Sequence, residues 1–166
     1  MFFRKRLIHI DLLPNFEKDD FELIRKLGRG WNFKSESYEE KIKEFLSQMF
    51  PRGDFYFFSS GRTALSSILL FLKDKFSQKE VYTQAFSCLV VPNAIKFAGL
   101  NPVFIDIEKG TFHMDINDLE NKISRDGLAL IVQNTFGLPD DLDRILKIVK
   151  ERNLFLIENL KNRDLS

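Results

Sequence analysis

Short apolar segments alternate with helical segments from residue 54 onward, and this alternation constrains the fold more than any other feature of the sequence. The expected strands are 54–58, 81–83, 102–107, 128–132 and 154–158, and the expected helices between them are 64–72, 89–97, 115–123 and 139–152. The strand centres lie roughly 20–30 residues apart, which is the spacing of βαβ units. Because the strands are continuous apolar runs, both faces of their sheet should be covered. The sequence therefore predicts an α/β fold, with a mainly parallel sheet and helices on both faces.

Residues 1–53 carry a different pattern, with helical periodicity and no strand. Apolar residues recur at helical spacing in 17–27 and again in 38–50. We therefore expect an amino-terminal helical segment, 1–53, followed by a separate α/β domain, 54–166.

The charge and the cysteine count exclude several classes of function. The 166 residues include 25 Lys and Arg against 24 Asp and Glu, a net charge of +1. Such a chain lacks the basic surplus that broad nucleic-acid binding requires. A single cysteine, Cys88, excludes an intramolecular disulfide framework, and two histidines leave little material for a His-rich metal site.

No stretch of the sequence approaches the roughly 20 apolar residues that a membrane span needs. The apolar stretch near the amino terminus is interrupted by Asp11 and Pro14, and no small-residue cleavage site follows it. A signal peptide is therefore not expected. We expect a cytoplasmic protein with neither a membrane nor a nucleic-acid partner.

Candidate ligand-binding segments follow from the predicted topology, because open parallel sheets bind ligands at the carboxyl ends of their strands. These segments are 59–63, 84–88, 106–110, 133–137 and 159–162. Four of the five are rich in Ser, Thr, Asn or Gln. The sequence therefore predicts a polar site along one edge of the sheet.

The turn Ser-Ser-Gly-Arg-Thr at 59–63 is the most informative of these segments. Gly61 allows a ligand to approach the backbone closely, the first turn of the following helix favours an anion, and Arg62 adds a positive charge. A phosphate is the natural ligand for such a turn. The alternative is an ordinary strand-to-helix turn in which Ser60 only caps the helix. Neither a Walker A loop nor a dinucleotide fingerprint is present.

Other residues near this edge have structural interpretations. Phe86 and Cys88 are of types that usually belong to the core, and no His near Cys88 would activate a thiol nucleophile. Asp140 and Asp141 open a predicted helix, where carboxylates interact favourably with the helix dipole. Metal binding is the weaker interpretation of these two aspartates.

Taken in order, the segments resemble the front half of the DegT/DnrJ/EryC1/StrS family, pyridoxal-phosphate (PLP) aminotransferases of fold type I that act mostly on nucleotide-linked keto-sugars. The matching runs are SSGRTAL (59–65), YTQAFSC (82–88), PNAIKFAG (92–99), NPVFIDI (101–107), TFGLPDDLD (135–143) and LIE (156–158). Each run is short, and it is their order and spacing that make the resemblance. It covers about residues 8–159 and implies the large domain of a fold type I enzyme, present only in part.

The resemblance implies which residues would hold the phosphate and the ring of PLP. The family's Ser-Gly-Thr turn, which binds the cofactor phosphate, aligns with Ser60, Gly61 and Arg62, so that Arg stands where the family has Thr. The family's ring-stacking aromatic residue aligns with Cys88. Its His before Tyr-Gly aligns with Asn134.

Two amides align with the family's positions beside the pyridine ring. Asn159 stands where the family has the Asp that pairs with the protonated pyridine nitrogen. An amide can form a hydrogen bond with this nitrogen but brings no charge to keep it protonated. Asn162 aligns with a family Gln.

The resemblance implies that the family's catalytic Lys aligns beyond Ser166, so we assign no catalytic residue to this chain. We expect the amino-terminal part of an aminotransferase that takes a nucleotide sugar and an amino-acid donor and is inactive alone. Its partner would be a second copy, or a full-length or split-gene partner chain. The alternative is a non-catalytic half-domain that binds a ligand or docks on a partner.

Overall fold

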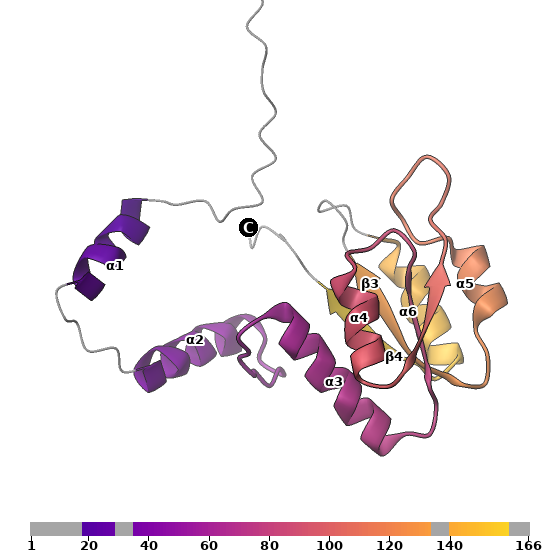
Figure 1. The fold of residues 1–166 in the computed structure, drawn as a ribbon, viewed down its shortest axis with the longest axis horizontal. Coiled ribbons are helices and arrows are strands. Elements are labelled where there is room, and N and C mark those ends of the chain that lie inside the picture. Colours follow the sequence, from indigo (N-terminus) through magenta and orange to yellow (C-terminus); the bar gives the residue numbers. More distant parts are fainter. Residues whose placement is uncertain (1–17, 29–34, 134–139, 160–166) are drawn as a thin grey trace, which may run out of the picture. The chain divides into compact units, whose positions relative to one another are not determined.

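The computed structural model describes residues 18–28, 35–133 and 140–159, and the fold is given for these residues (Figure 1). In chain order the elements are α1 (Lys18–Gly28), α2 (Ser35–Met49), α3 (Gly61–Lys75), β1 (Glu80–Gln84), α4 (Val90–Phe97), β2 (Asn101–Ile105), α5 (Ile116–Lys122), β3 (Gly127–Gln133), α6 (Leu142–Glu151) and β4 (Phe155–Asn159). The chain divides into two compact units, Met1–Phe55 and Tyr56–Ser166. The first unit contains α1 and α2. The assignment of 1–53 and 54–166 as functional domains stays a prediction.

The second unit is built on a four-stranded sheet with the order β2-β1-β3-β4. All three pairs of neighbouring strands are parallel. Helix α4 connects β1 to β2, α5 connects β2 to β3, and α6 connects β3 to β4. The observed sheet confirms the predicted parallel topology.

Helices α3 and α4 cover one face of this sheet, and α5 and α6 cover the other. On the first face, apolar side chains of α3 and α4 pack with Val81 of β1 and with Ala129 and Ile131 of β3. On the second face, side chains of α5 and α6 pack with Tyr82 of β1 and Leu130 of β3. Adjacent residues of one strand face opposite layers, as the pleat requires. This arrangement confirms the predicted α/β fold with helices on both faces.

The predicted strand over 54–58 is wrong. This segment has no strand structure, and the side chains of Tyr56, Phe57 and Phe58 are 78%, 42% and 44% exposed. Aromatic residues favour strands, but a strand also needs a neighbour to complete its backbone hydrogen bonds. Among the described residues, the edge strands of the sheet are β2 and β4, and neither pairs with 54–58.

Helix boundaries are set by capping groups as much as by the apolar pattern. Helix α3 begins at Gly61 rather than at the predicted residue 64, because Ser60 caps it. Helix α6 begins at Leu142 and is capped by Asp141, whose side chain accepts a hydrogen bond from the Arg144 N–H. The predicted start of this helix, residue 139, lies outside the described residues. No helix in the described part of the chain is long and apolar enough to cross a membrane.

Candidate functional site

The connections of the sheet place a topological switch between β1 and β3. The chain moves from β1 to β2 on one side, and then crosses back over β1 to reach β3 and β4 on the other side. Ligands of open α/β sheets bind outside the carboxyl ends of the strands at such a reversal. The carboxyl ends of β1 and β3, at Gln84 and Gln133, are therefore the centre of the candidate site.

The first turn of α3 lies toward this same edge of the sheet. The carboxyl-terminal end of α3 is placed by Phe76, whose ring packs on that of Phe155, the first residue of β4, with centroids 4.8 Å apart. The last turn of α3 also places Lys73 beside Gly99, just before β2 begins. The helix therefore ends at the amino edge of the sheet and begins at the opposite, carboxyl edge.

Ser60 caps α3, as the structural alternative for the turn at 59–63 predicts. Its Oγ accepts a hydrogen bond of 3.2 Å from the Thr63 N–H and lies 2.9 Å from Thr63 Oγ1. The first backbone hydrogen bond of the helix runs from the Ala64 N–H to the Ser60 carbonyl. The N–H groups of Gly61 and Arg62 precede this bond and remain available to an anion.

The glycine of this turn has space around it. Apart from Gly61 itself, its two chain neighbours and the nearby backbone of its own helix, no described atom lies within 4 Å of the point where a Cβ on Gly61 would stand. Packing within the described residues therefore gives no reason for a glycine at this position, whereas close approach of a ligand would. The adjacent Arg62 is exposed to solvent. The phosphate interpretation and the capping interpretation are thus compatible, since Ser60 engages Thr63 and leaves the first two N–H groups to a ligand.

Cys88 and Phe86 lie beyond the end of β1 and are not core residues, which corrects the expectation for both. The Cys88 thiol is free and exposed, and the Phe86 ring is 47% exposed. Phe86 packs on Phe112, with ring centroids 5.4 Å apart and an angle of 32° between the ring planes. These residues follow the strand rather than form part of it, and their side chains are exposed.

A buried polar cluster lies at the carboxyl end of β1, where the sequence pattern predicts only the end of a strand and the start of a helix. Gln84 is fully buried, and its Nε2 donates to the Phe112 carbonyl at 3.1 Å and to Asp140 Oδ2 at 3.4 Å. Asp140 Oδ1 accepts from the Met114 N–H at 2.8 Å. Asp140 therefore ties the loop before α5 to the end of β1, while its neighbour Asp141 caps α6.

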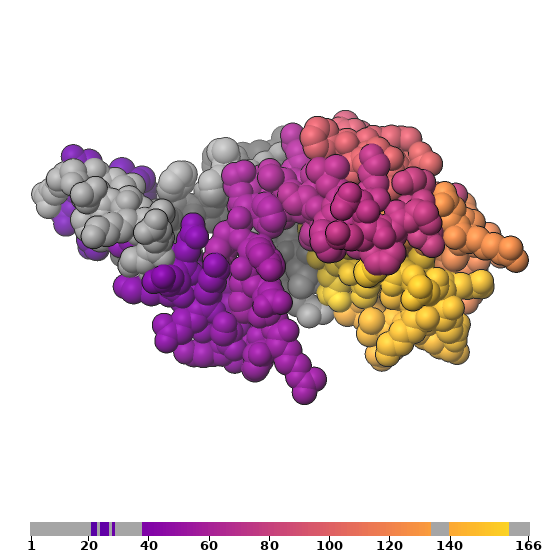
Figure 2. Space-filling model, turned by 90° about the horizontal axis from the view of Figure 1, so that it is seen from below, coloured from indigo at the N-terminus to yellow at the C-terminus, as the bar shows by residue number. Residues whose placement is uncertain are grey.

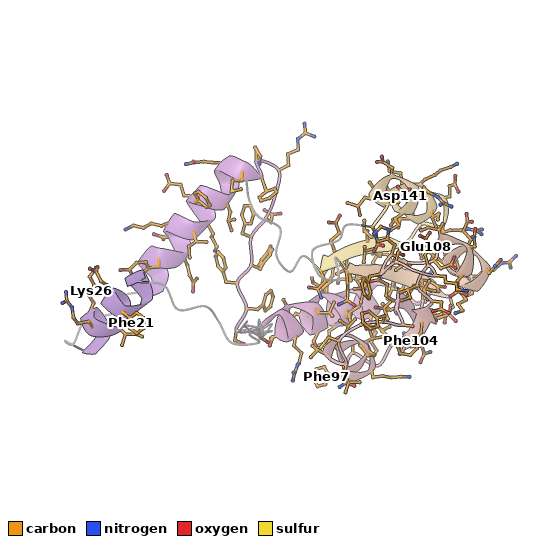
Figure 3. All side chains as sticks on the ribbon, turned by 90° about the horizontal axis from the view of Figure 1, so that it is seen from above. Phe21, Lys26, Phe97, Phe104, Glu108 and Asp141 are labelled. Carbon is orange, nitrogen blue, oxygen red and sulfur yellow. The ribbon has the colours of Figure 1, made fainter. Side chains whose placement is uncertain are left out.

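The environment of Asp140 raises the pKa of its carboxyl group. Burial is the main cause, because it disfavours the charged form. The hydrogen bond from Met114 and the nearby His113 act in the opposite direction, and Glu108 adds to the increase. Glu108 follows β2, and Asp141 directly precedes α6. Figure 3 shows these two residues on the same side of the unit.

Three buried side-chain oxygens near this edge have no hydrogen-bond partner among the described residues. They are Thr83 Oγ1, Gln84 Oε1 and Gln133 Oε1. By the alternation of each strand, Thr83 faces the same layer as Val81 and Gln133 the same layer as Ile131, which is the layer covered by α3. Buried polar atoms without partners are rare in folded proteins. Two of the three therefore lie on the face that also holds the turn at 59–63.

Asn159 is the last residue of β4 and is exposed. The strand register pairs it with Gln133 at the end of β3. The structure thus brings Asn159 to the carboxyl edge beside the buried polar atoms. Asn134 and Asn162, which the resemblance also aligns with site positions, lie outside the described residues.

The family with the description DegT/DnrJ/EryC1/StrS aminotransferase family matches residues 16–160. This match covers most of the chain and includes every described part of the site. The chain belongs to this aminotransferase family. The match accords with the parallel sheet.

Two of the relatives have names that refer to GDP-linked sugars. The chain is 35% identical over 101 residues to GDP-perosamine synthase of Escherichia coli O157:H7, a match that covers 61% of this chain and 28% of that protein. It is 29% identical over 127 residues to GDP-4-keto-6-deoxy-D-mannose 3-dehydratase of Yersinia pseudotuberculosis, covering 74% of this chain and 31% of the relative. The chain thus spans about a third of the length of these relatives.

Solved structures show the same fold. The aminotransferase from Psychrobacter cryohalolentis superposes with a TM-score of 0.73 at 18% identity, covering 87% of this chain and 37% of that one. A Streptococcus pneumoniae protein solved in its PLP form superposes with a TM-score of 0.67 at 25% identity, covering 89% and 38%.

Proposed function

We propose that the second unit is the cofactor-binding part of a PLP-dependent aminotransferase that acts on nucleotide-linked keto-sugars. The observation that carries this proposal is the start of α3 at the carboxyl edge of the sheet, with an unobstructed Gly61 and a flanking Arg62. Membership of the aminotransferase family and relatives that act on GDP-linked sugars support the substrate class.

The turn at 59–63 fits the phosphate group of PLP. The N–H groups of Gly61 and Arg62 would donate to the phosphate oxygens, and the guanidinium of Arg62 would neutralise part of their charge. Ser60 would hold the turn in shape through its bond with Thr63 rather than donate to the phosphate itself. The dipole of a 15-residue helix adds a further favourable interaction.

Cys88 and Asn159 would contact the pyridine ring, and Asn162 would lie close to it. When bound, PLP supplies an electron sink for the carbanion of transamination. A thiol at residue 88 can pack on one face of the ring, and the amide of Asn159 can form a hydrogen bond with the ring nitrogen. Because Asn159 carries no charge, it would hold the proton on this nitrogen less firmly than a carboxylate would.

We further propose that residues 1–166 have no transaminase activity by themselves. The proposal rests on the share of a relative that this chain matches, which is 28% of GDP-perosamine synthase. The chain would form a homodimer or bind a separate full-length or split-gene chain in the cytoplasm, and only such a separate chain could add groups that this sequence does not contain. A non-catalytic role in ligand binding remains the second candidate, favoured by the uncharged Asn159.

The phosphate site is tested with pyridoxamine 5′-phosphate, which has no aldehyde to react with surface lysines. Isothermal titration calorimetry should show binding to the wild-type chain and roughly tenfold weaker binding to Arg62→Ala, the cost of losing one charge-assisted contact. Arg52→Ala, an exposed arginine of the first unit, is the matched control and should bind as the wild type does. Equal affinities for all three proteins would contradict the proposal that the turn at 59–63 binds the phosphate.

A further inference from the structure

The loop between β2 and α5, residues 106–115, folds as a hairpin at the carboxyl edge of the sheet (Figure 1). Ile107 and Met114 form an antiparallel bridge across it, and the Glu108 N–H donates to the His113 carbonyl at 2.9 Å. These bonds give the loop its shape. They do not determine where it lies relative to the other strand ends, because that position depends on contacts with other segments. We call residues 106–115 the edge hairpin.

Two buried side chains from other segments hold the backbone of the edge hairpin. Gln84, the last residue of β1, donates from Nε2 to the Phe112 carbonyl at 3.1 Å. Asp140, which lies just before α6, accepts at Oδ1 from the Met114 N–H at 2.8 Å. Asp140 Oδ2 also lies 3.4 Å from Gln84 Nε2. The ends of two loops and the end of β1 are therefore joined by one polar link.

The packing of α5 and α6 brings the two loops of this link together. Side chains of both helices belong to one core cluster, which also includes Met114 of the edge hairpin. Figure 2 shows the orange surface of the segment around α5 adjoining the yellow surface of the carboxyl-terminal segment. The carboxyl group of Asp140, before α6, can therefore reach the backbone of the loop before α5.

The chemistry of the link favours a role in placing the edge hairpin over a role in stability alone. Burial disfavours the charged form of Asp140 and raises the pKa of its carboxyl group. Gln84 Oε1 is buried without a partner among the described residues. Apolar side chains would hold a loop on the core at a smaller cost. A carboxylate adds direction, because its oxygen accepts from one backbone N–H at a defined distance and angle.

The edge hairpin in turn contacts the segment that follows β1. The ring of Phe112 packs on that of Phe86, with centroids 5.4 Å apart. Because Gln84 binds the carbonyl of Phe112, the link holds the same residue that makes this ring contact. Phe86 lies two residues before Cys88, in a segment with neither helix nor strand structure. The position of this segment therefore depends on the edge hairpin as well as on β1.

We propose that Asp140 positions Cys88 for contact with the cofactor, by holding the edge hairpin on which Phe86 packs. The inference rests on the proposed function, in which the thiol of Cys88 packs on the ring of PLP. Asp140 acts through the backbone of the edge hairpin and is a positioning residue, with no contact to the ring assigned to it. Its loss should displace the segment that carries Cys88.

The reactivity of Cys88 tests this inference without any ligand. Cys88 is the only cysteine of the chain, so its rate of reaction with an aromatic disulfide reagent reports on this segment alone. Asp140→Ala removes the acceptor for the Met114 N–H, and the thiol should react about fivefold faster, the factor that corresponds to one lost hydrogen bond. Asp140→Asn keeps an acceptor oxygen and should react within about twofold of the wild type. Since both variants remove the same charge, their comparison separates position from electrostatics.

Two further variants show whether the effect passes through the edge hairpin. Phe112→Leu keeps the Asp140 bond but removes the ring that packs on Phe86, and it should speed the reaction as Asp140→Ala does. Asp118→Ala is the matched control, because Asp118 Oδ2 also accepts from the backbone of the edge hairpin, at the Asp106 N–H and 2.7 Å, but from α5. It should leave the rate unchanged. Urea denaturation establishes that each variant is folded under the labelling conditions.

Three results would overturn the inference: rates for Asp140→Ala or Phe112→Leu within about twofold of the wild type, an Asp140→Asn rate as fast as that of Asp140→Ala, or an equal effect of Asp118→Ala. Pyridoxamine 5′-phosphate separates the inference from the proposed function. It should slow the reaction of the wild-type thiol and protect Asp140→Ala less. Equal protection of both proteins contradicts the inference alone. No protection of the wild type contradicts the proposed function, and with it a role of Asp140 at a cofactor site.

Discussion

Polar side chains gather at both ends of strand β1, but only the carboxyl end has buried oxygens that lack a hydrogen-bond partner among the described residues. At the amino end, the Tyr82 hydroxyl donates to Glu80 at 2.9 Å and accepts from the Ser124 N–H at 3.0 Å. Ser124 Oγ also donates to Glu80 at 2.6 Å. Gly127 lies so close to this hydroxyl that a Cβ at residue 127 would stand 2.9 Å from the Tyr82 oxygen. At the carboxyl end, the oxygens of Thr83, Gln84 and Gln133 have no partner among the described residues.

This contrast separates structure from function along a single strand. At the amino end, the Tyr82 hydroxyl, the Glu80 carboxylate and Ser124 form hydrogen bonds with one another. At the carboxyl end, the buried groups keep acceptor oxygens unused among the described residues, at the place where parallel sheets bind ligands. We therefore expect the polar groups at the amino end to contribute to stability, and we propose that those at the carboxyl end face the ligand.

Tyr82→Phe should have the largest effect on stability. It removes the hydroxyl that accepts from Ser124 and donates to Glu80, and it leaves both partners without that bond. We expect the free energy of unfolding to fall by about 1–2 kcal/mol. Urea denaturation measures this change. A decrease in the free energy of unfolding of less than about 0.3 kcal/mol would mean that the hydrogen bonds of the Tyr82 hydroxyl do not stabilise the fold.

Asp140→Asn should change how stability depends on pH. The folded-state pKa of Asp140 is raised above the reference value of 3.8, chiefly by burial. Its contribution to stability is therefore fully present below the unfolded pKa and is lost as the pH rises through the folded pKa. Asn cannot ionise and avoids this loss.

Denaturation of both proteins across this range isolates the carboxyl group, because the difference between the curves removes other titrating groups. The stability of Asp140→Asn relative to the wild type should increase as the pH rises above about 3.8. If this difference in the free energy of unfolding stays constant or decreases as the pH rises, burial does not raise the pKa of the Asp140 carboxyl group.

Thr83→Val should have the smallest effect and provides the comparison with Tyr82. Both side chains are fully buried neighbours on β1, but Thr83 Oγ1 has no partner in the described part of the chain. Replacing its hydroxyl with a methyl group loses no hydrogen bond, so stability should stay within about 0.5 kcal/mol of the wild type. A loss as large as that of Tyr82→Phe would show that the two ends of β1 are equivalent.

The sequence predicts those parts of the molecule that depend on local patterns. The apolar runs of β1 and β3 indicate strands buried on both faces, and the turn at 59–63 indicates a helix start capped by Ser60. The carboxyl-edge rule also places Asn159 at that edge. It places the turn at 59–63 there only through the strand expected at 54–58, which the structure does not contain.

Other features depend on partners that lie far away in the sequence. Asp140 binds the Met114 N–H, 26 residues earlier, and Gln84, 56 residues earlier, so no local pattern identifies it as a buried link. The aromatic run at 54–58 predicts a strand, but a strand forms only where a neighbouring strand pairs with it, and none of the described strands does. Cys88 has a side chain typical of cores, yet its position after the strand end leaves it exposed.

The central claim is that the start of α3 binds the phosphate of PLP. Its most direct test is an amide NMR titration of the wild-type chain with pyridoxamine 5′-phosphate. We expect the N–H signals of Gly61 and Arg62 to shift first and most, in a saturable manner, because these groups would donate to the phosphate. Saturable shifts confined to other segments, or none at all, would contradict it.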